Sequence, residues 1–275
     1  MGKSRAVNKT DFSAMADALF EAEAASAQIP PLVSTFADVS VSDAYRIQQL
    51  VVDRKVELGA RIVGHKVGLS SRAMQAMLGV DEPDFGHLLD SMIFDDQSEL
   101  QIERFCQPRV EFEVAFVLDQ RLSGPGCTVA DVFRSTAFVL PSIEIIDSRF
   151  EDWKITLADT VADNASSAGF VLGGTPTKLT GLDLRTVGCV ARKNGAIVAT
   201  GAAGAVLGHP AKAVAWLANT LAQFGVELEA GEIVLPGSCT AAVGVEAGDA
   251  IGVDFAGLGH VGVSFVKSRG DQREG

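Results

Sequence analysis

The segment RVEFEVAFVL, residues 109–118, alternates charged and apolar side chains over its first half. Alternate side chains of a β-strand point to opposite faces of the sheet. The segment therefore predicts a strand with one continuous apolar face that belongs to the core. The opposite face carries Glu111 and Glu113, next to Ala115 and Val117. Carboxylates on a face that becomes apolar repel each other and are costly to desolvate, so they need a partner.

A third carboxylate, Glu144, lies inside the apolar segment FVLPSIEIID, residues 138–147, which also predicts a strand. Its partner is either a bound cation or an arginine, Arg109 or Arg149. An E-x-E pair is also typical of the solvated face of an edge strand. Three carboxylates without histidine favour Mg²⁺ or Mn²⁺ over zinc. Three monodentate ligands leave about three octahedral positions open, enough for a chelating 2-oxo acid.

Three further residues are candidates for proton transfer. Lys66 lies in GHKVGL, residues 64–69, and is either an acid/base group with a depressed pKa, a carboxylate anchor or an exposed lysine. Asp84 lies in a predicted polar loop, residues 80–90, where it is either a second proton-transfer group or a turn former. His87 shares this loop and suits proton transfer near neutral pH, although a lone loop histidine is commonly exposed.

Two polar segments are candidates for substrate binding. The segment ADNASS, residues 162–167, includes Ser166 and either hydrogen-bonds a substrate or forms a capped turn. The turn GSCT, residues 237–240, offers an anion its backbone N–H groups and the hydroxyls of Ser238 and Thr240. Glycine-rich turns of this kind also occur without any ligand.

The remaining chain predicts a β-rich α+β fold. Its 28 glycines indicate many tight turns. Amphipathic helices are expected over residues 11–27 and 42–59, the second capped by Ser42, and another is expected from His209-Pro210 to Phe224. We expect an N-terminal helical extension (1–60), a metal-binding catalytic domain (61–267) and a charged tail (268–275).

Composition argues against several classes of function. The net charge of −12 opposes binding to a phosphate backbone, and no apolar run approaches membrane-spanning length. The four cysteines form no CxxC pair, and no signal peptide is evident. We therefore expect a cytoplasmic protein with reduced thiols that acts on a small molecule.

Six segments carry a resemblance to a known family, and together they run from about residue 13 to 266. They are VGHKVGLSSRAMQAMLGVDEPDFGHLLD, PRVEFEVAFVL, PSIEIIDSR, DWKITLADTVADNASSAGFVLGG, VLGHPAKAVAWLAN and AGEIVLPGSCT. The chain resembles the 2-hydroxypenta-2,4-dienoate (2-oxopent-4-enoate) hydratases of aromatic meta-cleavage pathways, in the fumarylacetoacetate hydrolase superfamily. The GVDEPDFGHLLD and LPGSCT segments look closest to the 2-hydroxyhexa-2,4-dienoate hydratases of bacterial steroid-ring degradation.

The resemblance implies a role for each candidate residue. Glu111, Glu113 and Glu144 match the family's metal ligands, Lys66 and Asp84 its acid/base positions, and Ser166 a substrate-contacting serine. It also implies a mixed β-roll with flanking helices, bound Mg²⁺ or Mn²⁺, and a homo-oligomer of C5-type or related symmetry. The expected reaction adds water to a 2-hydroxy-2,4-dienoate and gives a 4-hydroxy-2-oxo acid.

Two alternatives remain open. The 4-oxalocrotonate decarboxylases share the three acidic residues, and TAAV at residues 240–243 resembles their sequence. The second alternative is that the chain is a non-catalytic partner subunit of a related enzyme. The intact carboxylates, together with Lys66 and Asp84, argue against that role.

Overall fold

The computed structural model describes residues 9–35, 39–71, 75–76 and 79–268. Its helices are α1 Lys9–Ala25, α2 Leu32–Thr35, α3 Val41–Glu57, α5 Val129–Ser135, α6 Leu157–Ala162 and α7 Pro210–Leu221, with 3₁₀ turns that include η1 Asp90–Met92, η4 Asn164–Ser166 and η6 Ala222–Phe224. Its strands are β1 Ile62–Gly68, β2 Asp84–Leu89, β3 Ile93–Phe94, β4 Glu99–Gln101, β5 Arg109–Leu118, β6 Thr136–Ile146, β7 Ser167–Leu172, β8 Gly188–Lys193, β9 Ala196–Ala202, β10 Ile233–Leu235, β11 Val243–Gly244, β12 Ala250–Phe255 and β13 Gly259–Val266.

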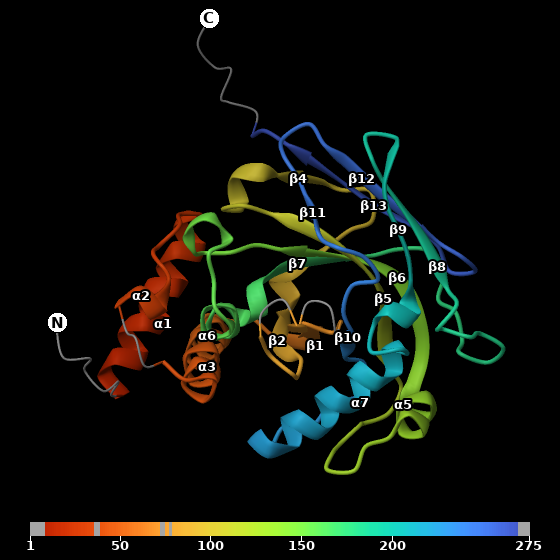
Figure 1. Cartoon of the computed structure of the whole chain (residues 1–275), viewed down its shortest axis with the longest axis horizontal. Helices are drawn as coiled ribbons and strands as arrows, with labels where there is room; N and C mark the ends of the chain where they lie inside the picture. Colours follow the sequence, from red (N-terminus) through yellow and green to blue (C-terminus); the bar gives the residue numbers. More distant parts are fainter. Residues whose placement is uncertain (1–8, 36–38, 72–74, 77–78, 269–275) are drawn as a thin grey trace, which may run out of the picture.

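The strands form two sheets. The larger has the order β2-β1-β10-β5-β6-β7-β3, with β11 paired to β5, and the smaller has the order β4-β13-β12-β8-β9. The larger sheet curls, because the free edge of β2 meets the η4 turn just before β7 (Figure 1). There the Asn164 side-chain amide donates to the His87 carbonyl at 2.9 Å and accepts from the His87 N–H at 2.8 Å. This arrangement confirms the predicted mixed β-roll with flanking helices.

The strand β5 has the two unlike faces that its sequence predicts. Its alternate apolar residues, Val110, Phe112, Val114, Phe116 and Leu118, are all buried. They belong to the main core, together with side chains of α7 and of the smaller sheet. On the other face Ala115 joins a second apolar cluster inside the curl, with Leu88, Phe170 and Leu235 among its members. The concave face is therefore apolar at one end, and the carboxylates of β5 occupy the other.

The N-terminal helices pack against a later part of the chain. Side chains of α1 and α3, including Leu19, Ile47 and Val51, share a cluster with Phe150 and with Val161 of α6. Figure 1 shows α1, α3 and α6 together at the left of the molecule. The predicted helices of this region are confirmed, but the predicted cap of the second one is wrong.

The residue that caps α3 is Ser40, two positions before Ser42. The Ser40 hydroxyl accepts from the Asp43 N–H at 3.1 Å, and the Asp43 carboxylate accepts from the Ser40 N–H at 3.2 Å. This reciprocal pair satisfies two backbone N–H groups at the start of the helix. Ser42 has no acidic residue three positions later, so it could not form the same pair. The helix predicted from residue 210 is confirmed as α7 followed by η6, and Gly225 ends it with a left-handed φ of 71°.

The predicted polar loop over residues 80–90 is wrong in its centre. Residues 84–89 form β2, which pairs antiparallel with β1 and is buried along its whole length. The apolar Phe85, Leu88 and Leu89 outweigh the turn-forming residues before them because all three enter the core. The sequence also predicts a short helix over residues 71–78, and most of these residues lie outside the described part of the chain. None of the helices in the described part is long and apolar enough to cross a membrane.

The contact between the smaller sheet and the 237–240 turn depends on Gly201. A Cβ at Gly201 would lie 2.3 Å from the Cys239 carbonyl oxygen. Overpacking against backbone predicts that Gly201→Ala lowers the free energy of unfolding by about 1–3 kcal/mol, measured by thermal denaturation. Gly188→Ala on the neighbouring strand is the control, because its Cβ would meet nothing closer than 3.7 Å. Equal melting temperatures of the two variants would contradict this account.

Candidate active site

Four strands bring five charged side chains to the concave face of the larger sheet. They are Lys66 of β1, Asp84 of β2, Glu111 and Glu113 of β5, and Glu144 of β6. The strand register explains the grouping, because Glu111 pairs with Glu144 across β5 and β6, and Asp84 pairs with Gly68 across β2 and β1. The four strands lie between residues 62 and 146, and the curled sheet brings the five groups together.

Three carboxylates form the centre of this group. One oxygen each from Glu111, Glu113 and Glu144 lies within 4.8 Å of the others. Glu113 and Glu144 are completely buried, while Glu111 is partly exposed. Glu113 Oε1 and Glu144 Oε2 are shielded from solvent and accept no hydrogen bond from the described residues. Buried, unpaired carboxylate oxygens fit a hard divalent cation such as Mg²⁺ or Mn²⁺, because they need positive charge and supply only oxygen ligands.

The other oxygens of Glu113 and Glu144 have partners that orient them. The Gly237 N–H donates to Glu113 Oε2 at 2.8 Å, and the Ser167 hydroxyl donates to Glu144 Oε1 at 3.0 Å. The sequence did not single out these two interactions. Gly237 was expected to serve an anionic ligand, and its N–H instead holds a carboxylate of the protein. One oxygen of Glu113 and one of Glu144 are therefore fixed, and the other remains available.

Lys66 is the cation next to the carboxylates. Its Nζ lies 3.4 Å from Glu144 Oε1 and donates to the Ala165 carbonyl oxygen at 3.0 Å. The side chain is buried, so it is not an exposed lysine. Glu144 does not use the arginines considered from the sequence: Arg149 pairs with Asp163, and the Arg109 guanidinium lies 4.4 Å from the centre of the Trp153 ring.

Burial and mutual repulsion keep the pKa values of this site far from their ordinary values. Burial raises the pKa of Glu111 to about 7, with Lys66 opposing and Glu144 reinforcing the shift. Burial, Glu144 and Glu111 raise the pKa of Glu113 well above its ordinary range. Burial alone would lower the pKa of Lys66, but the surrounding carboxylates, Glu144 foremost, raise it overall. The depressed pKa considered for Lys66 is therefore wrong for the metal-free protein, in which this side chain is an ammonium.

Asp84 is the fourth carboxyl group of the site. It is 2% exposed, and burial raises its pKa against the opposing charge of Lys66. Its Oδ1 accepts no hydrogen bond within the described structure. Gly68 leaves room for it, because a Cβ there would lie 2.0 Å from this oxygen. Asp84 is therefore a carboxyl group that can carry a proton, held by a strand and not by a loop.

The three residues predicted to bind substrate are engaged in hydrogen bonds within the protein. The Ser166 hydroxyl is buried 3.0 Å from the Thr160 hydroxyl. The Ser238 hydroxyl accepts from the Phe112 N–H at 3.2 Å, and the Thr240 hydroxyl donates to the Ala241 carbonyl at 3.0 Å. Substrate contact by Ser166, Ser238 and Thr240 stays a prediction.

His87 does not share the face of the carboxylates. It is three positions after Asp84 on β2, so its ring points to the opposite side of the sheet. The ring is buried with its centre 5.0 Å from that of His65. Burial, reinforced by His65, lowers the pKa of His87 to about 3. His87 is therefore neither exposed nor part of the group around the carboxylates.

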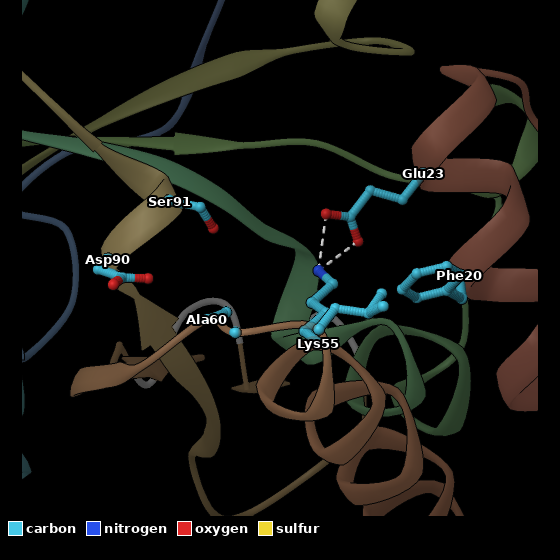
Figure 2. Close-up of a pocket in the computed structure, with 8 residues that line it drawn as sticks. Phe20, Glu23, Lys55, Ala60, Asp90 and Ser91 are labelled. Atoms are coloured by element: carbon cyan, nitrogen blue, oxygen red, sulfur yellow. Dashed lines mark hydrogen bonds and ion pairs between the residues drawn. The ribbon is translucent and has the colours of Figure 1, made fainter.

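A surface hollow of about 650 Å³ lies apart from the carboxylates (Figure 2). Its lining comes from α1, α3, the segment after α3 and η1, and includes Phe20, Ala60, Asp90 and Ser91. Inside it Lys55 and Glu23 point toward each other, with Lys55 Nζ 2.7 and 2.6 Å from the two carboxylate oxygens. These charges satisfy each other, so the hollow offers no reactive group comparable to the site on the sheet.

Comparison with known proteins agrees with the resemblance noted in the sequence. A family sequence model described as fumarylacetoacetate (FAA) hydrolase C-terminal matches residues 53–266. The 2-keto-4-pentenoate hydratase of Paraburkholderia xenovorans is 44% identical over 254 residues, which cover 92% of this chain and 94% of that protein. The 2-hydroxyhexa-2,4-dienoate hydratase of Comamonas testosteroni is 42% identical over 251 residues, which cover 90% and 95%.

A solved structure is similar over nearly the whole chain. It is that of 4-oxalocrotonate decarboxylase from Pseudomonas putida G7, complexed with magnesium and adipate. The TM-score is 0.92 at 40% identity, with 95% of this chain and 100% of that chain covered. Proteins named as hydratases and as decarboxylases are thus similar to this chain at nearly the same identity.

The raised pKa of Glu111 predicts that this carboxylate destabilises the metal-free protein. Since its pKa in the folded protein is about 7 and its ordinary value is 4.5, the folded state keeps a proton that the unfolded chain releases, and stability falls as the pH rises through this interval. In EDTA at pH 8, Glu111→Gln should therefore melt above the wild type by roughly 2–8 °C, the shift for about 1–2 kcal/mol in a chain of this size. The difference should vanish near pH 4.5, and a variant less stable at pH 8 would contradict the repulsion.

Proposed function

Because the chain belongs to the fumarylacetoacetate hydrolase family, we propose that it is a hydratase that adds water to a 2-hydroxy-2,4-dienoate and forms a 4-hydroxy-2-oxo acid. The observation that carries the proposal is the site itself. Three carboxylates that lack enough positive charge face a buried ammonium and a carboxyl group with a raised pKa. This set can hold a cation and can move protons within one shielded space.

Glu111, Glu113 and Glu144 would hold the cation, which we propose to be Mg²⁺ or Mn²⁺. Bound there, it would supply Lewis-acid polarisation of the substrate's 2-oxo acid end. The protein contributes the orientation of its ligands, through the Gly237 N–H on Glu113 and the Ser167 hydroxyl on Glu144. The magnesium in the solved structure of the decarboxylase supports this assignment.

Lys66 and Asp84 would manage the protons of the reaction. One group takes the enol proton of the dienoate, and the other delivers a proton to C5, the far end of the diene, which leaves a 2-oxo-3-enoate. Water then adds across the remaining double bond, with its hydroxyl on C4 and a proton on C3. As an ammonium, Lys66 can deliver a proton, and the free Oδ1 of ionised Asp84 can accept one. The reverse assignment requires Lys66 to lose its proton first.

A decarboxylase that acts on a 2-oxo dioic acid is the second candidate, because the similar solved structure is that of such an enzyme. A dioic substrate brings a second carboxylate, which calls for a second cation. Within the part of the chain that the structure describes, Lys66 is the only cation whose charge shifts the pKa of Glu111, and Glu144 and Ala165 already engage it. With Lys66 engaged in this way, the second carboxylate of a dioic substrate would need a cation that lies farther from Glu111.

We expect the purified protein to consume 2-hydroxypenta-2,4-dienoate or 2-hydroxyhexa-2,4-dienoate, followed by loss of ultraviolet absorbance, and to lose this activity in EDTA. A series from C5 to C7 would give the preferred tail length. Incubation with 4-oxalocrotonate and measurement of CO₂ would test the second candidate. Rapid CO₂ release together with no dienoate consumption would replace the hydratase assignment by the decarboxylase.

Removal of either proton-transfer group should lower turnover, and removal of Lys66 should also lower stability because it leaves the buried Glu144 without its cation. We expect Lys66→Met and Asp84→Asn to lower kcat at least 100-fold, the scale of general acid–base catalysis. Lys55→Met is the matched control, because Lys55 is ion-paired with Glu23 in the separate hollow. Steady-state kinetics on protein with a confirmed circular dichroism spectrum would measure the effect. An equal fall of kcat in all three variants would contradict the proposed roles of Lys66 and Asp84.

A further inference from the structure

The turn that contacts Lys66 has an unusual backbone. Asn164, Ala165 and Ser166 all have a left-handed φ, of 53°, 51° and 57°. The left-handed region costs a residue with a side chain roughly 1–2 kcal/mol, and glycine would avoid this cost. Strained backbone of this kind persists only where the surrounding structure imposes it, and such segments cluster at functional sites.

A buried ion pair holds the start of this turn. The Asp163 carboxylate accepts from the Arg149 N–H at 3.0 Å and from Arg149 Nε at 2.5 Å, and Arg149 Nη2 donates to the Asp163 carbonyl at 2.8 Å. The two residues are 5% and 2% exposed. Several charge-assisted hydrogen bonds between two buried groups fix both the position and the orientation of the backbone at residue 163.

The next residue of the turn is fixed to the edge of β2. The Asn164 side chain pairs with both backbone groups of His87. Gly86 permits this close approach, because a Cβ there would lie 2.4 Å from the Asn164 carbonyl oxygen. The turn is thus held from two sides, by Arg149 and by β2.

The turn directs a polar group at each member of one ion pair in the site. The Ala165 carbonyl accepts from Lys66 at 3.0 Å, and the Ser167 hydroxyl donates to Glu144 at 3.0 Å. The separation of 3.4 Å between Lys66 Nζ and Glu144 Oε1 therefore depends on where the turn lies. A relaxed turn would move the Ala165 carbonyl, and the ammonium would lose the one hydrogen-bond acceptor, apart from the carboxylates, that the described residues give it.

We propose that Arg149 and Asp163 are positioning residues that place the Lys66 ammonium through the carbonyl of Ala165. The proposal rests on the function proposed above, in which Lys66 transfers a proton. Neither residue touches the reacting atoms, and their effect passes through the backbone of residues 163–166. A misplacement of about 1 Å at a reacting group can lower a rate about 100-fold, so an intact turn matters for turnover even where the fold survives its loss.

The test compares two substitutions of the ion pair with a matched control. Asp163→Asn places an amide donor against an arginine donor, and the milder Arg149→Lys keeps the charge but loses the planar fork. The control, Asp249→Asn, changes another buried aspartate, whose Oδ2 accepts from the Glu246 N–H at 2.7 Å in the turn before β12. We expect kcat per folded molecule to fall 10- to 100-fold in the first two variants, with KM and the calorimetric Mn²⁺ affinity within threefold of the wild type. The control should keep kcat within twofold.

Each other outcome has a defined meaning. An unchanged kcat in folded Arg149→Lys and Asp163→Asn would overturn the proposal, as would an equal loss in Asp249→Asn. If Asp163→Asn fails to fold, Arg149→Lys decides alone. A crystal structure of the folded variant supplies a readout that is independent of the reaction, because Lys66 Nζ should leave hydrogen-bonding distance of the Ala165 oxygen. If the wild type turns over no dienoate, the proposed function fails, and the position of Lys66 in that structure still decides the inference.

Discussion

The site depends on one electrostatic imbalance: among the described residues, three buried carboxyl groups and the partly exposed Glu111 share a single ammonium. Lys66 acts on Asp84, Glu111 and Glu113 and contacts Glu144 directly, yet burial still raises the pKa of three of these groups. Such an arrangement opposes folding, because each carboxylate loses solvation and gains a like-charged neighbour. It persists because the apolar face of β5 and the core around it stabilise the strands that carry the charges.

The two faces of the larger sheet have different roles. The outer face supports the site, and the inner face carries its reactive groups. The outer face of the curled sheet packs against α7 and the smaller sheet, while the inner face is left for carboxylates at one end and apolar side chains at the other. Backbone groups and small hydroxyls then orient what the strands bring together: the Gly237 N–H, the Ser167 hydroxyl and the Ala165 carbonyl. These groups are neutral, so they orient the carboxylates and the ammonium without adding charge to a site that already has an excess of negative charge.

The sequence predicted the strands and the acidic triad because period-two alternation and an acid in an apolar run are local signals. It misplaced Asp84 in a loop because Pro83 and Gly86 signal turns locally, whereas burial of Phe85, Leu88 and Leu89 is a tertiary effect. It left the partner of Glu144 open because Lys66 is distant in the chain and reaches it only across the curl. The roles of Arg149 and of the Ala165 carbonyl were equally invisible, since backbone conformation and backbone acceptors leave little trace in residue types.

The central place of β10 has a consequence for how the protein is made. This strand lies between β1 and β5, parallel to one and antiparallel to the other, although residue 64 pairs with residue 233. Until the ribosome has released residues 233–235, β1 and β5 have no partner between them, and the Lys66 ammonium has no fixed distance to the carboxylates of β5. β5 and β6 pair directly with each other and do not need β10, so their three carboxylates can meet earlier. The place of β1, and of the Lys66 ammonium, in the finished sheet is completed only when nearly all of the apolar core is available.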